Sequence, residues 1–238
     1  MKAFILQTSP IWQDARSNIS FMEDFIVKTE AINSDLILLP EMWASGFSVV
    51  QPIYDHQAQT WMQDAAQRFG CAIAGTLVVK ENGHYFNRFY FYKPDGSFDH
   101  YDKRHLFGNE KQLFTAGEKR TIVNWKGFRI LLQTCYDLRF PGFSRNRNDY
   151  DIALYVASWP SSRQDAWTIE NQCYVLGANR TGDDPCLHYT GGSVAYSFSG
   201  ALMTDLKDKI CAKSVEIDLQ SLTSFRQKFP FLQDADTY

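Results

Sequence analysis

The chain has 238 residues, of which 45% are hydrophobic and 21% are charged, and its formal net charge is −3. This composition is typical of a globular protein, and the length predicts one domain, residues 1–238, with a sizeable core. The mildly acidic balance, without a block of basic residues, argues against a nucleic-acid partner.

Short apolar runs predict strands, and three helical patterns lie between them. The strand-like runs are AFILQ (3–7), DLILLP (35–40), CAIAGTLVV (71–79), YFNRFYFY (85–92), FRILLQT (128–134), DIALYVAS (151–158), YVLGANR (174–180), VAYSF (194–198) and SVEIDL (214–219). Apolar residues at three- and four-residue steps predict helices within 17–32, 61–69 and 219–225. KPDGSF at 93–98 predicts a hairpin turn. This alternation favours an α/β architecture with mixed sheets.

Three of the predicted strands are followed by a residue with useful chemistry. Glu41 follows LILLP, Lys103 follows the hairpin, and Cys135 follows RILLQT. Binding sites in open α/β sheets gather where strands end, so these residues are candidates for one site.

A thiol, a carboxylate and an ammonium form a coherent catalytic set. The thiol of Cys135 is a nucleophile once it is deprotonated, and Glu41 in a dry pocket is suited to take the proton. Lys103 is suited to stabilise the oxyanion that forms when a carbonyl carbon is attacked, and the backbone N–H of Tyr136 is a second candidate donor.

Each of the three residues also has a plain structural interpretation. The alternative role of Cys135 is a small buried hydrophobic residue, that of Glu41 is a helix cap, and that of Lys103 is a solvated surface side chain. Their spacing along the chain shows only that they come from different strands.

The motifs around these residues resemble the nitrilase superfamily of carbon–nitrogen hydrolases over nearly the whole chain. The matching stretches are LPEMWASGFS, FNRFYFYKPDGSFDHYDKRHLF, FTAGEKR, CYDLRFPGFSRN, ASWP, IENQCYVLGANRTGDD, HYTGGS and FPFLQDAD. The resemblance is strongest to the bacterial omega-amidase branch, whose members hydrolyse the terminal amide of 2-oxoglutaramate or 2-oxosuccinamate.

The resemblance implies a role for each candidate. Cys135 is the nucleophile, Glu41 the general base, Lys103 the oxyanion-stabilising cation, and Glu110 the second glutamate that supports the base. The implied fold is a four-layer α-β-β-α sandwich, commonly assembled as a homodimer, that needs neither a metal nor an organic cofactor. The sequence agrees, since it has no H-E-x-x-H spacing and no glycine-rich nucleotide loop.

The expected partners are therefore a small amide and water. The far carboxylate of an omega-amide needs a cation, for which the candidates are Arg104, Arg139 and Arg163. The candidate aromatic walls of the pocket are Phe47, Phe107 and Trp159. Surface salt bridges and ordinary core packing are the alternative roles of these arginines and aromatic residues.

The N-terminus and the cysteines indicate a compartment. MKAFILQTSPIWQD has only four consecutive apolar residues before Gln7, fewer than an export signal or a membrane span needs. The five cysteines form no C-x-x-C pair, which favours reduced thiols. We expect a cytoplasmic protein with no membrane partner.

Alternative functions remain open. Within the same superfamily they are a carbamoylase, an aliphatic amidase or an acyltransferase. The segments 48–60 and 161–169 look shortened relative to the family pattern, which alternatively favours a non-catalytic binding protein on the same fold.

Overall fold

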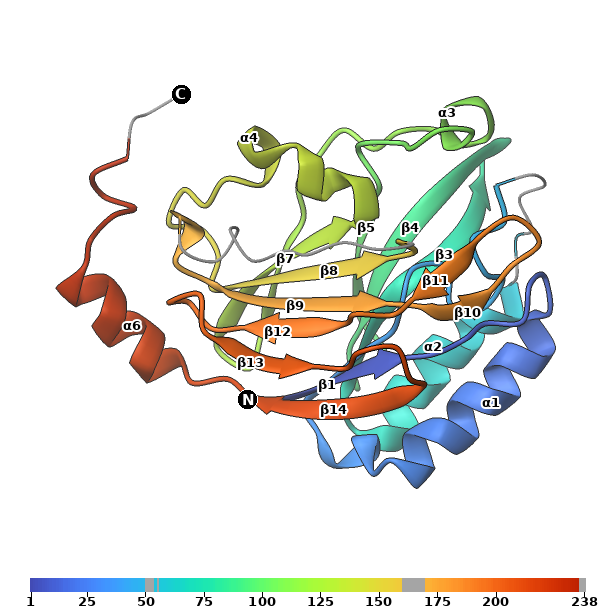
Figure 1. Cartoon of the computed structure of the whole chain (residues 1–238), viewed down its shortest axis with the longest axis horizontal. Helices are drawn as coiled ribbons and strands as arrows, with labels where there is room; N and C mark the ends of the chain where they lie inside the picture. The colour runs from blue at the N-terminus through green and yellow to red at the C-terminus, as the bar shows by residue number, and fades with distance from the viewer. Residues whose placement is uncertain (50–53, 55, 160–169, 236–238) are drawn as a thin grey trace.

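The computed structural model describes residues 1–49, 54, 56–159 and 170–235. Two six-stranded mixed sheets stack face to face, and helices flank them (Figure 1). The first sheet is formed, in spatial order, by β14 (Cys211–Glu216), β1 (Lys2–Gln7), β2 (Leu36–Leu38), β3 (Ala72–Glu81), β4 (His84–Tyr92) and β5 (Phe98–Asp102). The second is formed by β13 (Leu202–Asp205), β12 (Val194–Tyr196), β9 (Tyr174–Asn179), β8 (Ile152–Ala157), β7 (Phe128–Thr134) and β6 (Ile122–Trp125). The expected α-β-β-α sandwich with mixed sheets is confirmed.

The centre of each sheet is parallel and its margins are antiparallel. Strands β1, β2 and β3 run parallel in the first sheet, as do β7, β8 and β9 in the second. Their apolar runs are continuous because both faces are buried. In β1, Ala3 and Ile5 face the core between the sheets, while Phe4 and Leu6 belong to the cluster on the helix side. This alternation is the two-residue period of a strand.

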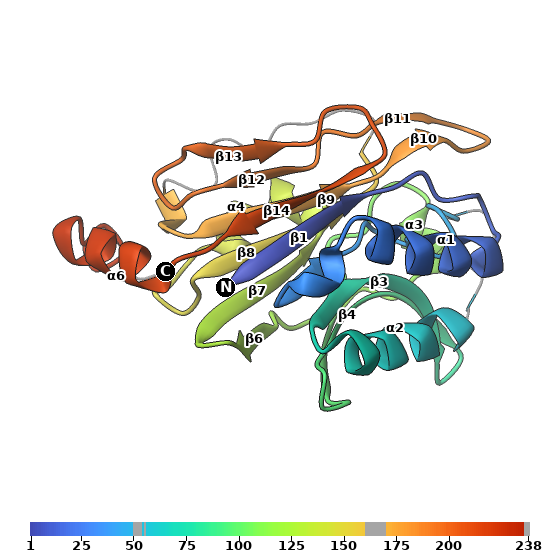
Figure 2. The same ribbon diagram turned by 90° about the horizontal axis from the view of Figure 1, so that it is seen from below.

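Helices α1 (Ala15–Lys28) and α2 (His56–Phe69) cover the outer face of the first sheet (Figure 2). Met22 and Ile26 of α1 pack with Met62 of α2 in the cluster on that face. The start of α1 is fixed by Asp14, whose carboxylate accepts a hydrogen bond from the N–H of Ser17 at 3.1 Å. Such an N-cap satisfies a backbone donor that the helix itself cannot pair.

The remaining elements are short, apart from the C-terminal helix. They are η1 (Ala31–Asn33), α3 (Glu110–Leu113), η2 (Cys135–Arg139), α4 (Pro141–Ser144), the two-stranded ribbon of β10 (Thr181–Asp183) and β11 (His188–Thr190), and α6 (Leu219–Lys228). Helix α6 projects away from both sheets in Figure 1, and only its Leu222 is buried.

The predicted elements are present, with shifted bounds. The first helix spans 15–28 and is followed by η1, and the second begins at 56, before its apolar pattern. The strand predicted at 214–219 is found at 211–216, because Asp218 caps α6 and so ends the extended chain. Strands β6, β10, β11 and β13 were not predicted. They are only three or four residues long and carry no extended apolar run.

Parts of the segments expected to be shortened lie outside the described residues. These are residues 50–53 and 55 of the segment 48–60, and the whole of 161–169 with its Arg163. Within the described part of the chain, every helix is too short or too polar to cross a membrane.

Candidate active site

Strands from both sheets end at one place and bring the candidate residues together. Glu41 follows β2 and Lys103 follows β5, both in the first sheet. Cys135 follows β7, and Ser158 follows β8, in the second sheet. The site therefore lies where the ends of the two stacked sheets meet.

Lys103 lies between two carboxylates. Its Nζ donates to Oε1 of Glu41 at 2.9 Å and to Oε2 of Glu110 at 2.7 Å. All three side chains are fully buried. Burial alone lowers the pKa of a lysine, but Glu41 and Glu110 together raise the pKa of Lys103 well above its ordinary value. The ammonium is therefore charged at neutral pH.

Asn87 of β4 is a member of the cluster that the sequence did not indicate. Its Nδ2 donates to Oε1 of Glu41 at 2.8 Å and to Oε1 of Glu110 at 3.1 Å. The N–H of Phe107 donates to Oε2 of Glu110 at 2.7 Å. Glu110 thus accepts hydrogen bonds at both oxygens, and Asn87 fixes its position relative to Glu41. The only signal in the sequence was one polar residue within the aromatic run YFNRFYFY.

Glu41 keeps one oxygen free. Its Oε2 is buried and has no hydrogen-bond partner among the described residues. Burial raises the pKa of Glu41; Lys103 opposes that rise and Glu110 adds to it. A buried carboxylate with a raised pKa and an open oxygen is suited to take up and return a proton.

Cys135 lies on a tight turn at the end of β7. Its φ is +46°, in the left-handed region that residues other than glycine rarely adopt. The turn is held by Asp137, which accepts the Thr134 N–H at 2.9 Å. Burial raises the pKa of the Cys135 thiol well above its ordinary value, and Glu41 adds to the rise, while Lys103 and the N–H of Ser158 oppose it. The resting thiol is therefore protonated and needs a base.

The loop that carries Lys103 is fixed through its backbone. The N–H of Lys103 donates to Asn87 O at 3.0 Å, and its C=O accepts from the N–H of Gly117 at 3.0 Å. A Cβ on residue 117 would lie 2.0 Å from Asp102 O, so only glycine allows this close approach.

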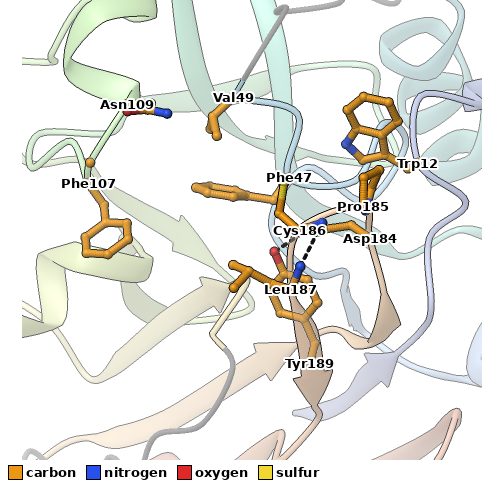
Figure 3. A pocket seen from close by; sticks show the side chains of 11 residues that line it. Trp12, Phe47, Val49, Phe107, Asn109, Asp184, Pro185, Cys186, Leu187 and Tyr189 are labelled. Carbon is orange, nitrogen blue, oxygen red and sulfur yellow. Dashed lines mark hydrogen bonds between the residues drawn. The ribbon is translucent and has the colours of Figure 1, made fainter.

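A pocket of about 260 Å³ lies near the buried cluster, although neither Glu41, Lys103 nor Cys135 is among its described lining residues. Figure 3 shows Phe47, Leu187 and Tyr189 grouped around its centre, with Trp12 and Phe107 at opposite ends. The Phe47 ring centroid lies 5.8 Å from Lys103 Nζ, which places the pocket beside the buried cluster. Its walls are mainly apolar, and no lysine or arginine is among the described residues that line it.

Asp184 is the one acidic residue among the described lining residues, and both its oxygens are occupied. Its Oδ1 accepts from the N–H groups of Cys186 and Leu187, each at 2.8 Å, and its Oδ2 accepts from Tyr189 OH at 2.6 Å. Asp184 therefore shapes the pocket wall rather than offering a free charge.

The other predicted residues lie around this centre. The Tyr136 ring packs against Phe107 at a centroid distance of 5.2 Å. Arg139 is exposed, and neither it nor the half-buried Trp159 is among the described lining residues of the pocket. Arg104 donates from Nη1 to the carbonyl oxygen of Gly117 at 3.0 Å, which gives it a structural contact.

No group of three or more His, Cys, Asp or Glu side chains in the described ranges is arranged to hold a metal ion.

Three comparisons relate the chain to known proteins. Residues 2–227 match the family model described as "Carbon-nitrogen hydrolase". The sequence is 39% identical to omega-amidase YafV of Escherichia coli (strain K12), covering 100% of this chain and 98% of that protein, and 28% identical to 2-oxoglutaramate amidase of Bacillus subtilis (strain 168), covering 89% and 88%. The crystal structure of XC1258 from Xanthomonas campestris, a CN-hydrolase superfamily protein with an arsenic adduct in its active site, superposes with a TM-score of 0.92 at 36% identity, covering 100% of this chain and 98% of that one.

Proposed function

The chain belongs to the carbon-nitrogen hydrolase family, and on that basis we propose that it is an amidase that releases ammonia from the terminal amide of a small carboxylic acid. The proposed substrates are similar to 2-oxoglutaramate or 2-oxosuccinamate. Support for this class comes from the relatives described as omega-amidase and 2-oxoglutaramate amidase. The product is the corresponding acid.

In the proposed mechanism, Cys135 is the nucleophile and Glu41 is the base. Oε2 of Glu41 takes the thiol proton, and the sulfur forms a bond to the amide carbon. The carbonyl oxygen gains the negative charge, which the ammonium of Lys103 and the N–H of Tyr136 stabilise. When the carbon–nitrogen bond breaks, Glu41 returns the proton to the nitrogen and ammonia leaves.

The second half of the reaction uses the same groups. Glu41 removes a proton from water, and the hydroxide adds to the thioester carbon while Lys103 again stabilises the oxyanion. The carbon–sulfur bond then breaks, the acid leaves, and the proton returns to the sulfur of Cys135. Glu110 and Asn87 keep Lys103 and Glu41 in place throughout.

One observation carries this proposal most strongly. Lys103 binds only one oxygen of Glu41, so the other is buried and open, and Glu41 is near enough to Cys135 for its charge to raise the pKa of the thiol. A purely structural ion pair leaves no such acceptor, because an unpaired buried carboxylate oxygen costs free energy.

The direct test measures ammonia release from 2-oxoglutaramate. We expect the wild-type protein to be active and Cys135→Ala to be inactive. Cys71→Ala, which removes another buried thiol, is the matched control and should retain activity. A Cys135→Ala protein that releases ammonia at the wild-type rate would rule out the mechanism.

The apolar lining of the pocket favours an aliphatic amidase as a second candidate function. A substrate panel separates the candidates: 2-oxoglutaramate, a short aliphatic amide, glutamine, an N-carbamoyl amino acid and a simple nitrile. Added hydroxylamine distinguishes an acyltransferase by the product ratio, since an acyltransferase forms the hydroxamate in place of the free acid, whereas an amidase still forms mainly the acid. A non-catalytic protein would turn over none of these.

We also propose a cytoplasmic homodimer. All five cysteines are free, which fits a reducing compartment. Leu202 and Met203 on edge strand β13 are 55% and 38% exposed, and Phe231 after α6 is 48% exposed, which fits a surface that a second copy covers. Light scattering after gel filtration measures the subunit number, and a monomer would refute this assembly.

A further inference from the structure

Asp137 is a buried carboxylate that accepts four hydrogen bonds. Its Oδ1 accepts from the N–H of His105 at 3.0 Å and from Nδ1 of the same ring at 2.7 Å. Its Oδ2 accepts from Tyr101 OH at 2.7 Å and from the N–H of Thr134 at 2.9 Å. Because a carboxylate only accepts, Nδ1 of His105 carries its proton. Asp137 is fully buried.

These donors and Asp137 itself lie on both sides of Lys103 and Cys135 in the sequence. Tyr101 comes two residues before Lys103, and His105 comes two residues after it. Thr134 directly precedes Cys135, and Asp137 itself comes two residues after Cys135. The Asp137 side chain therefore holds both the loop that carries Lys103 and the turn that carries Cys135.

The two segments come from different sheets. Tyr101 belongs to β5 of the first sheet, and Thr134 is the last residue of β7 of the second. The His105 ring also stacks on Phe140, just after the turn, with centroids 3.8 Å apart and an interplanar angle of 9°. Asp137 thus joins the end of β5 to the end of β7, next to Lys103 and Cys135.

We propose that Asp137 is a positioning residue, which sets the place of the Lys103 ammonium relative to the Cys135 sulfur without touching the substrate. The proposal rests on the function proposed above, in which Lys103 stabilises charge on an atom bonded to that sulfur. A displacement of about 1 Å between such groups is enough to lower a rate by about 10²-fold.

Asp137→Asn is a sharp test because all four neighbours donate. The amide keeps one acceptor oxygen, and its NH₂ group must face the other pair of donors. Each pair includes a backbone N–H, of His105 or of Thr134, which cannot turn to become an acceptor. In either orientation one of the two segments therefore loses its anchor.

Asp151→Asn is the matched control. Asp151 is also buried and accepts several hydrogen bonds, from Arg129 and Arg226, but it has no contact with the site. We expect Asp137→Asn to lower kcat about 100-fold with KM changed less than about twofold, whereas Asp151→Asn keeps kcat within about twofold. Both are assayed where circular dichroism shows the protein to be folded. Equal kcat values for the two variants would overturn the proposal.

Alkylation of Cys135 by iodoacetamide gives a readout that needs no substrate. We expect Asp137→Asn to slow this reaction about tenfold at pH 7, because a displaced Lys103 no longer favours the thiolate, while Asp151→Asn leaves the rate unchanged. If the wild type hydrolyses no amide, the proposed function fails, but the alkylation rates still decide the role of Asp137. Equal alkylation of the two variants would refute that role.

Tyr101→Phe carries the test if Asp137→Asn does not fold. It removes the hydroxyl that donates to Asp137 and accepts the N–H of Arg104 at 2.9 Å on the Lys103 side, and it keeps the carboxylate. We expect kcat to fall about fivefold and alkylation to slow, an effect smaller than that of a full misplacement. Tyr150→Phe is its control. The buried Tyr150 OH donates to Ser144 O at 2.8 Å, and this hydrogen bond does not involve the loop of Lys103. Wild-type values of both measurements in Tyr101→Phe would again overturn the proposal.

Discussion

Two buried acidic clusters in this molecule have opposite electrostatic character. Glu41 shares one lysine with Glu110, has an open oxygen and has a raised pKa. Asp151 accepts hydrogen bonds from Arg129 and Arg226 at both oxygens, and although burial alone raises its pKa, these partners lower it. Both carboxylates are buried, so burial alone does not make a base. What separates them is the charge nearby: Glu41 has one lysine and a second carboxylate beside it, whereas Asp151 has two arginines.

The largest expected effect is on catalysis, from Glu41→Gln. The amide has nearly the same shape but cannot accept the thiol proton, so we expect kcat/KM to fall by about 10²–10⁴-fold. Steady-state ammonia release measures this change. Activity within a factor of two of wild type would mean that Glu41 is as purely structural as Asp151.

The next effect is on stability, from Asp151→Asn. Loss of charge-assisted hydrogen bonds from two arginines is expected to lower the free energy of unfolding by about 1.5–3 kcal/mol. The arginine heads are partly exposed, which places the expected value toward the lower end. Urea unfolding at pH 7 measures it. An unchanged urea midpoint would contradict the structural role of this cluster.

The smallest effect is a shift in the pH dependence of activity. Glu41 must be ionised to act as a base, and its pKa is raised, so activity should fall with decreasing pH at values above the ordinary glutamate pKa of 4.5. Glu110→Gln removes the like charge near Glu41, and Glu41 becomes the one carboxylate that pairs with Lys103. The pKa of Glu41 therefore falls. We expect the acid limb of kcat/KM to move to lower pH, whatever the change in its maximum.

The opposite pKa shifts of Glu41 and Asp151 also predict opposite pH dependences of the stability that each contributes. A raised pKa in the folded state means that the Glu41 contribution is fully present below pH 4.5 and is lost as the pH rises through the folded pKa. The lowered pKa of Asp151 has the opposite consequence, because its contribution is present above pH 3.8 and is lost as the pH falls through the folded value. The free energy of unfolding is measured for wild type, Glu41→Gln and Asp151→Asn across pH 3–8. The difference from wild type should change with pH in opposite directions for the two variants.

The sequence indicated candidate residues at strand ends more readily than residues within strands. Glu41 and Cys135 each follow an apolar run and Lys103 follows the hairpin, and these are local signals. Asn87 was missed because its importance depends on which face of β4 meets the loop of Glu110, and that follows from tertiary packing. Asp137 was missed because two of its donors, Tyr101 and His105, lie more than thirty residues earlier in the chain.

Helix and strand bounds were wrong where polar residues begin or end an element. Helix α2 begins at His56, but its first two residues are exposed and Ala58 is the one buried residue of its first turn, so the apolar pattern becomes visible only later. The opposite error occurred near Asp218, where an apolar run continues across the boundary between a strand and a helix. Capping and exposure decide such boundaries, and hydrophobic periodicity does not report them.

The pairing of β1 with β14 has a consequence for biosynthesis. Lys2 pairs with Glu216, so β1 stays without its outer neighbour β14 until residues 211–216 have left the ribosome. Contacts between such distant residues form slowly, and an unpaired strand edge is prone to intermolecular association. The nascent chain thus has an unpaired strand edge until β14 has been synthesised, and chaperones that shield emerging chains would increase the yield of active molecules.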